Sequence, residues 1–410
     1  MTDPTELLRH ARRRAEGLRP RYRAAGSWTA EPIDLVGPAA ARHPSRLAVA
    51  DRGAELTYGE LDKRIDSAAR AMVDAGLAPG SAIVVVVGND VDSVVSVHAA
   101  LRVDAVVLLV PRSAGATQIA DILTRTGARF GVAPNWATIA DAELSGLCEW
   151  IELGDDGRTG TTRPPRPVRA ADEPCLVLYT SGTTARPKGV IHSLSTLAKA
   201  SANYIAAAGL GSDDRIFLIS PLASVTGVLQ ALFIGPMLAA PVILEDRWDP
   251  AATCDLLVSS GATWYGGPDR LLDRMLDRAV ARRAVVPLRA VYLGGTMLDR
   301  RIVERIEDEF GIVVMRAYGS SETRSARPVC GPNPETSAMP TTVWRSAAST
   351  CASDPSPNPP SAASRVRTRF SVTPTPRTTN TRSRGSGSAP VMWRRLSAAG
   401  FGSSAGSRTS

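Results

Sequence analysis

A run of hydroxyl-bearing residues that ends in a lysine is the part of this sequence best suited to chemistry. Residues 179–190 read YTSGTTARPKGV and continue an apolar run that starts at Cys175. Hydroxyls, a flexible glycine and a cation so close together supply O–H and N–H donors and a positive charge for a polyphosphate. A Walker loop is excluded, because the pattern GxxxxGK[ST] is absent. The residues that could bind phosphate are Thr180, Ser181, Gly182, Thr183, Thr184 and Lys188.

A solvated turn rich in Ser and Thr is the alternative interpretation of this run, and composition alone favours it. The flanking segments favour a ligand site. An apolar strand is predicted before the run, and a helix is predicted from Ser193 onward. Open α/β sheets bind ligands where their strands end, so we predict a phosphate-binding loop here.

The elements that must position this loop alternate along residues 1–322 between strand-like runs and amphipathic helical segments. This order predicts an α/β fold of layered, mostly parallel sheets flanked by helices. Prolines 164, 165 and 167 predict an exposed connection between two lobes, residues 1–163 and 164–322. Strands are predicted over residues 47–50, 82–87, 105–110, 175–180, 215–219, 241–244, 290–293 and 312–315. Helices, with caps such as Thr57 and Asp90, are predicted over residues 58–75, 91–101, 117–126, 193–208, 250–259 and 297–310.

The composition excludes several classes of protein. With 410 residues, 44% apolar and 21% charged, the chain can form two or three domains with cores and is neither fibrous nor wholly disordered. Its five cysteines and four histidines are scattered, which argues against a zinc site or a disulfide scaffold. The longest apolar stretch, 227–244, is interrupted by polar residues and prolines and predicts a buried helix and strand, not a membrane span. The charged N-terminus does not resemble a secretory signal, so we expect a soluble cytoplasmic protein.

The net charge of +8 is concentrated at the end of the chain. Residues 323–410 contain 12 Arg, no Lys and two acidic residues, which leaves 36 basic and 38 acidic side chains in residues 1–322. This terminal segment is rich in Ser, Thr, Pro and Arg without apolar periodicity, so it is predicted to be a disordered tail. A basic tail for RNA or DNA is the alternative, but aromatic interleaving and RGG repeats are absent, so no nucleic acid partner is expected.

The segment 179–190 resembles the signature loop of the adenylate-forming, or AMP-binding, superfamily of acyl- and aryl-CoA synthetases, adenylation domains and luciferases. Other segments agree with that family in order and spacing, and the resemblance covers roughly residues 20–322. It stops at Glu322. The agreeing segments are TYGEL at 57–61, PLASVTG at 221–227, RWDP at 247–250, YLGGTML at 292–298 and AYGSSE at 317–322.

The resemblance implies an ATP-dependent acid:CoA ligase that activates a carboxylic acid as an acyl-adenylate, with Mg²⁺, and transfers it to coenzyme A or a carrier thiol. Carried over by position, it implies Thr184, Lys188 and Glu322 as catalytic residues, with Glu322 holding the metal. It also implies that Tyr318 packs on adenine. The remaining implied ATP-binding residues are Thr180, Ser181, Gly182, Thr183, Gly294, Gly295, Thr296, Gly319 and Ser321. The expected substrate pocket comprises Ser224, Gly227, Gly266 and Gly267.

Each of these residues also has a purely structural interpretation: the paired glycines as a turn, Tyr318 as core and Glu322 as a helix cap. His192 is interpreted as structural rather than catalytic. The chain departs from the family at Ala185, which replaces a glycine and carries strain of about 1 kcal/mol if its φ is positive. It also departs at Ser224, where relatives place His or an aromatic residue, and at Ser321, where Thr is commoner.

The substrate is weakly encoded in the sequence. Relatives that activate amino acids place an Asp in the segment equivalent to 221–227, and none is present there, which disfavours an amino acid. Residues 21–28, RYRAAGSW, are similar to aryl and alicyclic acid ligases, and residues 264–267 could shape a compact apolar pocket. We therefore expect an aromatic, cyclic or medium-chain acid.

The end of the chain departs most from the family. Relatives continue with a TGD motif, a GRxKD hinge and a lid that carries a catalytic lysine, whereas the last lysine here is Lys199. With permitted codons regrouped one base earlier, residues 386–393 read Trp-Phe-Gly-Thr-Gly-Asp-Val and residues 403–410 read Val-Val-Gly-Arg-Val-Lys-Asp-Val. We interpret residues 323–410 as a frameshifted segment and expect impaired ligation. The alternative is a non-catalytic, nucleotide-binding remnant.

Overall fold

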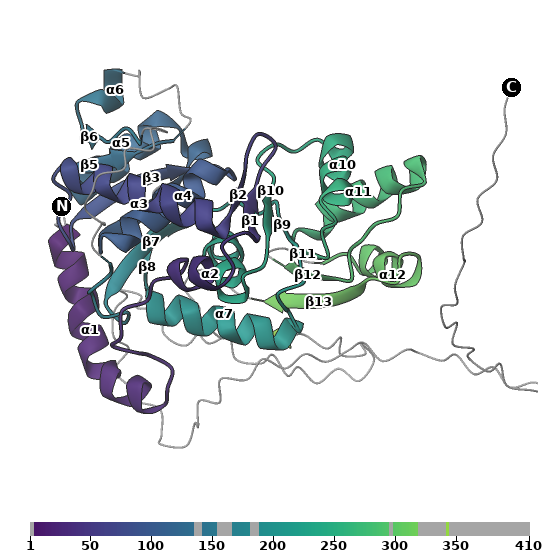
Figure 1. Ribbon diagram of the computed structural model, residues 1–410, viewed down its shortest axis with the longest axis horizontal. Helices are drawn as coiled ribbons and strands as arrows, with labels where there is room; N and C mark the ends of the chain where they lie inside the picture. Colours follow the sequence, from purple (N-terminus) through teal and green to yellow (C-terminus); the bar gives the residue numbers. More distant parts are fainter. Residues whose placement is uncertain are drawn as a thin grey trace, which may run out of the picture. The chain divides into compact units, whose positions relative to one another are not determined.

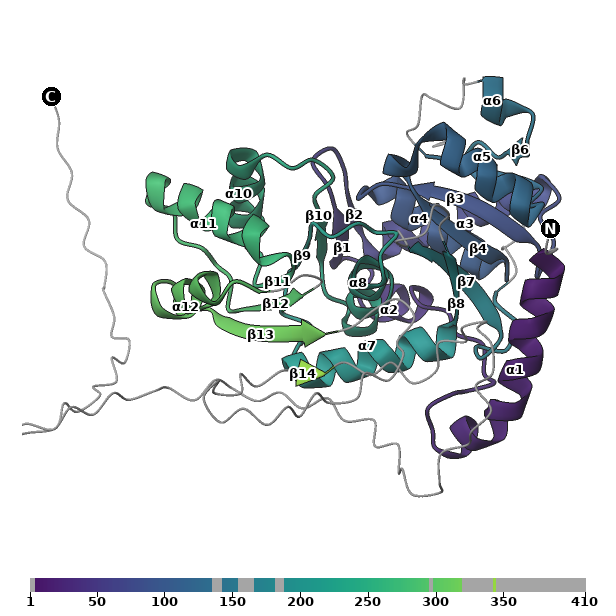
Figure 2. The ribbon, with the colours of Figure 1, turned by 180° about the vertical axis from the view of Figure 1, so that it is seen from behind.

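The computed structural model describes residues 4–134, 142–153, 166–180, 188–294, 298–318 and 342–343. Two parallel-rich sheets with helices packed around them form the described part (Figures 1 and 2), which confirms the predicted α/β class. The predicted two-lobe boundary at residue 163 stays a prediction, and each sheet takes strands from both sides of it. Apart from a two-residue strand at 342–343, the expected tail lies outside the described residues.

The eight-stranded sheet has the order β14-β13-β12-β11-β9-β10-β1-β2. All its neighbours are parallel except the β1–β2 pair. The carboxyl ends of β9, β11, β12 and β13 therefore lie along one edge. Its strands are β1 (Leu47–Ala50), β2 (Glu55–Thr57), β9 (Ile216–Leu218), β10 (Val242–Leu244), β11 (Trp264–Gly267), β12 (Ala290–Gly294), β13 (Val313–Tyr318) and β14 (Thr342–Val343).

The six-stranded sheet has the order β6-β5-β3-β4-β7-β8, and only the β7–β8 pair is antiparallel. Its central strands are almost entirely Val, Leu and Ile and are buried, as expected for strands covered on both faces. Its strands are β3 (Ala82–Val87), β4 (Val106–Pro111), β5 (Phe130–Val132), β6 (Glu149–Trp150), β7 (Pro174–Thr180) and β8 (Lys188–Ser193).

The helices begin at the caps that the sequence predicts. Thr57 forms a capping box with Glu60 at the start of α3, and the Asp90 carboxylate accepts the Ser93 N–H at the start of α4. The longer helices are α1 (Pro4–Ala24), α3 (Tyr58–Asp74), α4 (Val91–Arg102), α5 (Gly115–Thr126), α7 (Leu194–Ala208), α10 (Pro250–Ser259), α11 (Asp269–Arg282) and α12 (Arg300–Asp308). The short ones are α2 (Gly37–Arg42), η1 (Arg112–Ala114), α6 (Ala142–Ser145), α8 (Val225–Gly227), the π-helix η3 (Val228–Ile234) and α9 (Gly235–Leu238).

The largest apolar core joins the two sheets. It contains Leu109 and Leu178 of the six-stranded sheet together with Leu218 and Trp264 of the eight-stranded sheet, and all four are almost fully buried. Helix α7 contributes buried residues such as Leu197 and Tyr204 to this core, and its place beside the sheets can be followed in Figures 1 and 2. The two sheets are therefore packed through one continuous interior.

All eight predicted strands are present, while β2, β5, β6, β8, β11 and β14 were not predicted. The helix predicted from Ser193 onward is confirmed as α7, for which Ser193 is the N-cap. Strand β8, which precedes this helix, was not predicted, and it forms because Val190 and Ile191 are buried against β7 in an antiparallel hairpin. Strand β11 was missed because two of its four residues are glycines. The stretch 227–244 is a buried helix and strand, as predicted, and none of the described helices could span a membrane.

A buried arginine fastens α3 and α4 together. Arg102, at the end of α4, is 3% exposed and donates to Asp62 at 2.6 Å, to Asp66 at 2.5 Å and to Asp34 at 3.2 Å. Burial by itself raises the pKa of Asp34, but Arg102, the Gly37 N–H and Arg166 lower it below its ordinary value.

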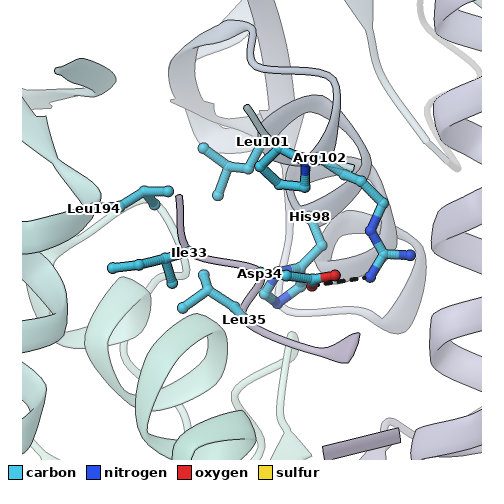
Figure 3. A pocket seen from close by; sticks show the side chains of 8 residues that line it. Ile33, Asp34, Leu35, His98, Leu101, Arg102 and Leu194 are labelled. Atoms are coloured by element: carbon cyan, nitrogen blue, oxygen red, sulfur yellow. Dashed lines mark hydrogen bonds and ion pairs between the residues drawn. The ribbon is translucent and has the colours of Figure 1, made fainter. Parts of the chain in front are cut away.

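Figure 3 shows the small pocket beside this arginine, with His98 and Asp34 on one side and apolar residues such as Leu101 and Leu194 on the other. Its interior of about 10 Å³ has room for about one water. Arg102 and Asp34, which both line the pocket, pair with each other, so the pocket is part of the structural ion cluster. Its volume is too small for a metabolite.

Candidate functional site

Several expected site residues meet at one edge of the eight-stranded sheet. Gly266 and Gly267 end β11, Gly294 ends β12, and Tyr318 ends β13. The strands are in register there, because Gly267 pairs with Leu293 and Gly294 pairs with the residue before Tyr318. Carboxyl ends of parallel strands are the usual ligand edge of such sheets.

The segment 221–227 folds into a tight loop beside this edge. Ser224 caps α8: its hydroxyl donates to the Pro221 carbonyl at 2.7 Å and accepts the Gly227 N–H at 3.1 Å. A Cβ at Gly227 would lie 2.2 Å from the Pro221 oxygen, so only glycine fits. Two of the four residues expected in the substrate pocket, Ser224 and Gly227, thus hold this loop closed.

A residue that the sequence analysis missed holds the loop in place. Asn89, which follows β3 of the six-stranded sheet, is 5% exposed. Its amide nitrogen donates to the carbonyls of Ser220 at 3.0 Å and Glu245 at 3.1 Å, and its amide oxygen accepts the Leu222 N–H at 2.7 Å. These three bonds use both donors and the oxygen of the side chain. The sequence signal that could have identified Asn89 is a carboxamide two residues after a buried strand.

Asn89 therefore joins the carboxyl end of β3 to the segments that follow β9 and β10. The contact continues across the edge, because the Ser220 hydroxyl donates to the Gly266 carbonyl at 3.3 Å. A chain of hydrogen bonds thus runs from the six-stranded sheet to the end of β11.

The expected phosphate-binding residues are only partly described. Thr180 ends β7 and Lys188 begins β8, and the two residues are paired across the hairpin. The Lys188 side chain is exposed. The other expected residues of the ATP site lie outside the described residues, and so does Ala185. They are Ser181, Gly182, Thr183, Thr184, Gly295, Thr296, Gly319, Ser321 and Glu322. In the part of the chain that the structure covers, no group of three His, Cys, Asp or Glu could hold a metal ion.

His192 lies on β8 opposite Leu176 and is 2% exposed. Neither ring nitrogen has a hydrogen-bond partner within the described ranges. Burial lowers the pKa of His192 to about 4, so the ring is neutral at physiological pH. This environment supports the structural interpretation of His192.

Comparison with protein families gives a match over most of the chain. The family described as AMP-binding enzyme matches residues 38–350. Among curated proteins, the chain is similar to feruloyl-CoA synthase of Amycolatopsis sp, at 25% identity over 74% of this chain and 60% of that protein. It is also similar to 2-succinylbenzoate–CoA ligase of Geobacillus kaustophilus, at 26% identity over 69% of this chain and 57% of that protein. The chain thus spans about 60% of the length of such relatives.

Solved structures share the fold. The N-terminal domain of FACL13 from Mycobacterium tuberculosis matches with a TM-score of 0.65 and 20% identity, over 71% of this chain and 76% of that chain. O-succinylbenzoate coenzyme A synthetase from Bacillus subtilis, in complex with AMP, matches with a TM-score of 0.63 and 20% identity, over 72% of this chain and 60% of that chain.

We expect Asn89→Ala to loosen the 221–227 loop selectively. The substitution leaves the Leu222 N–H and two buried carbonyls unpaired, so it should lower the free energy of unfolding by about 2 to 4 kcal/mol. Hydrogen–deuterium exchange of the Leu222 amide should accelerate, while the amides of β3 and β4 keep their protection. Asn203→Ala on α7 is the matched control, because the Asn203 amide nitrogen has no partner in the described part of the chain. Unchanged protection at Leu222 would contradict this role of Asn89.

We expect the protein to lose stability as the pH falls from about 6.5 to about 4, in part through His192. The unfolded chain protonates this histidine in that window while the folded chain does not, so protonation favours unfolding. His192→Leu should give a shallower decline in unfolding free energy between pH 7 and pH 4.5, measured by urea denaturation. His43→Leu, at an exposed position, is the control and should decline like the parent. A decline of the same steepness in His192→Leu would refute the assignment.

Proposed function

The chain belongs to the AMP-binding enzyme family, and on that premise we propose that it binds ATP and activates a carboxylic acid as an acyl-adenylate. The observation that carries the proposal is the arrangement of Gly266, Gly267, Gly294 and Tyr318 at one sheet edge beside the loop closed by Ser224. The carboxyl ends of parallel strands are where such sheets usually bind a ligand.

In the proposed reaction a carboxylate oxygen attacks the α-phosphorus of ATP, and the bond to the departing pyrophosphate breaks. Negative charge builds on the phosphoryl oxygens, and the protein must offset it with cations and N–H donors. We assign Lys188 and Thr184 to the phosphates and Tyr318 to the adenine ring. The position of Lys188 supports its assignment to the phosphates, because Lys188 is the first residue of β8 and pairs with Thr180, the last residue of β7.

We assign Glu322 to Mg²⁺, which would neutralise phosphate charge when bound. A carboxylate suits this hard cation. The described residues contribute no cluster of metal ligands, so the assignment rests on the family position of Glu322 alone.

The proposed second step is attack of a thiol, that of coenzyme A or a carrier, on the acyl carbonyl, with release of AMP. Similar proteins include CoA ligases and a salicyl-AMP ligase / salicyl-S-ArCP synthetase from Mycobacterium tuberculosis. Their names favour an aromatic or cyclic acid as the substrate. They are compatible with either coenzyme A or a carrier thiol as the acceptor. We propose that ligation by this chain is impaired, because residues 323–410 contain no lysine and differ in composition from the rest of the chain. The second candidate function, nucleotide binding without catalysis, is favoured by the same observation.

Lys188→Met should weaken ATP binding at least tenfold, because an ammonium paired with phosphate contributes about 1.5 to 3 kcal/mol. Isothermal titration with ATP and Mg²⁺ measures this, and acid-dependent exchange of pyrophosphate into ATP measures adenylation. Lys63→Met is the matched control, since Lys63 is exposed on α3. ATP binding with equal affinity in both variants would remove Lys188 from the site. Binding without exchange for any acid would favour the nucleotide-binding remnant.

Resequencing the gene from before the Glu322 codon to beyond the Ser410 codon should reveal one inserted or deleted base. Correcting it should restore the TGD and GRVKD motifs and a downstream lysine, because a choice of permitted codons places both motifs in one shifted frame. The corrected protein should then form acyl-CoA, whereas the chain of 410 residues should form much less of it. An unchanged reading frame would disprove the frameshift.

A further inference from the structure

A buried glutamine lies over the end of β11. Gln230, on the π-helix η3, is fully buried, and its amide nitrogen makes a long contact of 3.5 Å with the Gly266 carbonyl. A Cβ at Gly266 would lie 2.1 Å from that nitrogen, so the carboxamide occupies the space that any side chain at 266 would take. Glycine at 266 and glutamine at 230 therefore fit together, and π-helical turns of this kind are frequent at functional sites.

The amide oxygen of Gln230 has no hydrogen-bond partner among the residues that the structure describes. The amide nitrogen faces the Gly266 carbonyl because the amide oxygen, turned to that side, would face another acceptor. A buried acceptor without a donor is costly and calls for an explanation. Gln230 lies three residues after Gly227, in the π-helix that follows the closed loop.

A second unpartnered polar atom belongs to the same part of the core. Tyr292, the register partner of Gly266 on β12, is 9% exposed, and its hydroxyl also has no partner within the described ranges. Its ring lies 4.5 Å from the ring of Tyr204 and 6.4 Å from that of Trp264, measured between centroids. Register partners on parallel strands project to the same face, so Tyr292 and the Gln230 amide are on one side of the sheet.

We infer that Gln230 selects the acid: its amide oxygen accepts a hydrogen bond from a hydroxyl or amino group on a cyclic or aromatic acid, and the Tyr292 hydroxyl provides the second polar contact. This inference rests on the proposed acid activation and narrows its substrate class. Sites that hydrogen-bond a substrate hydroxyl discriminate strongly against the analogue that lacks it, because buried polar groups are then left unpaired. A plain fatty acid is a poor fit to this arrangement.

The test compares binding of benzoate and cinnamate with that of their monohydroxylated derivatives, by calorimetry on the full chain. At least one hydroxylated acid should bind wild type about tenfold or more tightly than its parent. Gln230→Met, similar in size but without the acceptor, should remove that preference while still binding the parent acids. Tyr292→Phe should reduce it in part. Gln118→Met on α5 makes the same chemical change in the other sheet layer and should leave the preference intact.

Thermal unfolding of Gln230→Met provides a readout without any ligand. Because the variant removes an unpartnered buried oxygen, its midpoint should equal or exceed that of wild type, whereas a clear fall would show that the amide is needed by the fold and would overturn the inference. Equal binding of parent and hydroxylated acids, no binding by any acid of the panel, or a preference that survives in Gln230→Met would also overturn it. Discrimination among acids in a chain that binds no ATP would instead refute the proposed ligase function and leave the inference standing.

Discussion

The arrangement of the site depends on one buried carboxamide. Asn89 sits where β3 ends, and its three side-chain hydrogen bonds reach the segments after β9 and β10 in the other sheet. Two sheets packed only by apolar contact can slide, because dispersion and burial are not directional. Hydrogen bonds of 2.7 to 3.1 Å fix one register between their carboxyl ends. The loop that contains Ser224 is placed by that register.

At the carboxyl edge of the eight-stranded sheet, two glycines pack closely against backbone and amide groups. Gly227 lets its helix start directly on the Pro221 carbonyl, and Gly266 makes room for the Gln230 amide. Neither glycine has a positive φ, so each is required by space and not by backbone conformation. The result is a sheet edge where polar groups approach one another with few side chains between them, which suits recognition of a small, partly polar ligand.

The sequence predicted the elements well where one local rule dominates. Runs of Val and Leu gave β3 and β4, and Thr57 and Asp90 marked the helix starts. Prediction from the sequence failed where tertiary contacts decide the secondary structure. Half of the residues of β11 are glycine, and this segment is a strand because β9 and β12 pair with it on both sides. Segment β8 is a strand because it pairs with β7. Gly294 and Tyr318 came from a family pattern and Gly266 from the run 264–267, and the structure places all three at one edge. Asn89 and Gln230 carry no such pattern, because their roles arise from partners more than 30 residues away.

The order of strands in the eight-stranded sheet has a consequence for how the chain is made. Strand β1 is complete early in synthesis, yet its parallel partner β10 lies about 190 residues later, with Val49 beside Val242. At about 5 to 20 residues per second, the ribosome delivers that partner roughly 10 to 40 s afterwards. During this interval the β1–β2 hairpin presents an unpaired apolar edge, the kind of surface on which nascent chains associate with one another. Temporary cover of the β1 edge by a chaperone during translation would therefore govern the yield of folded protein.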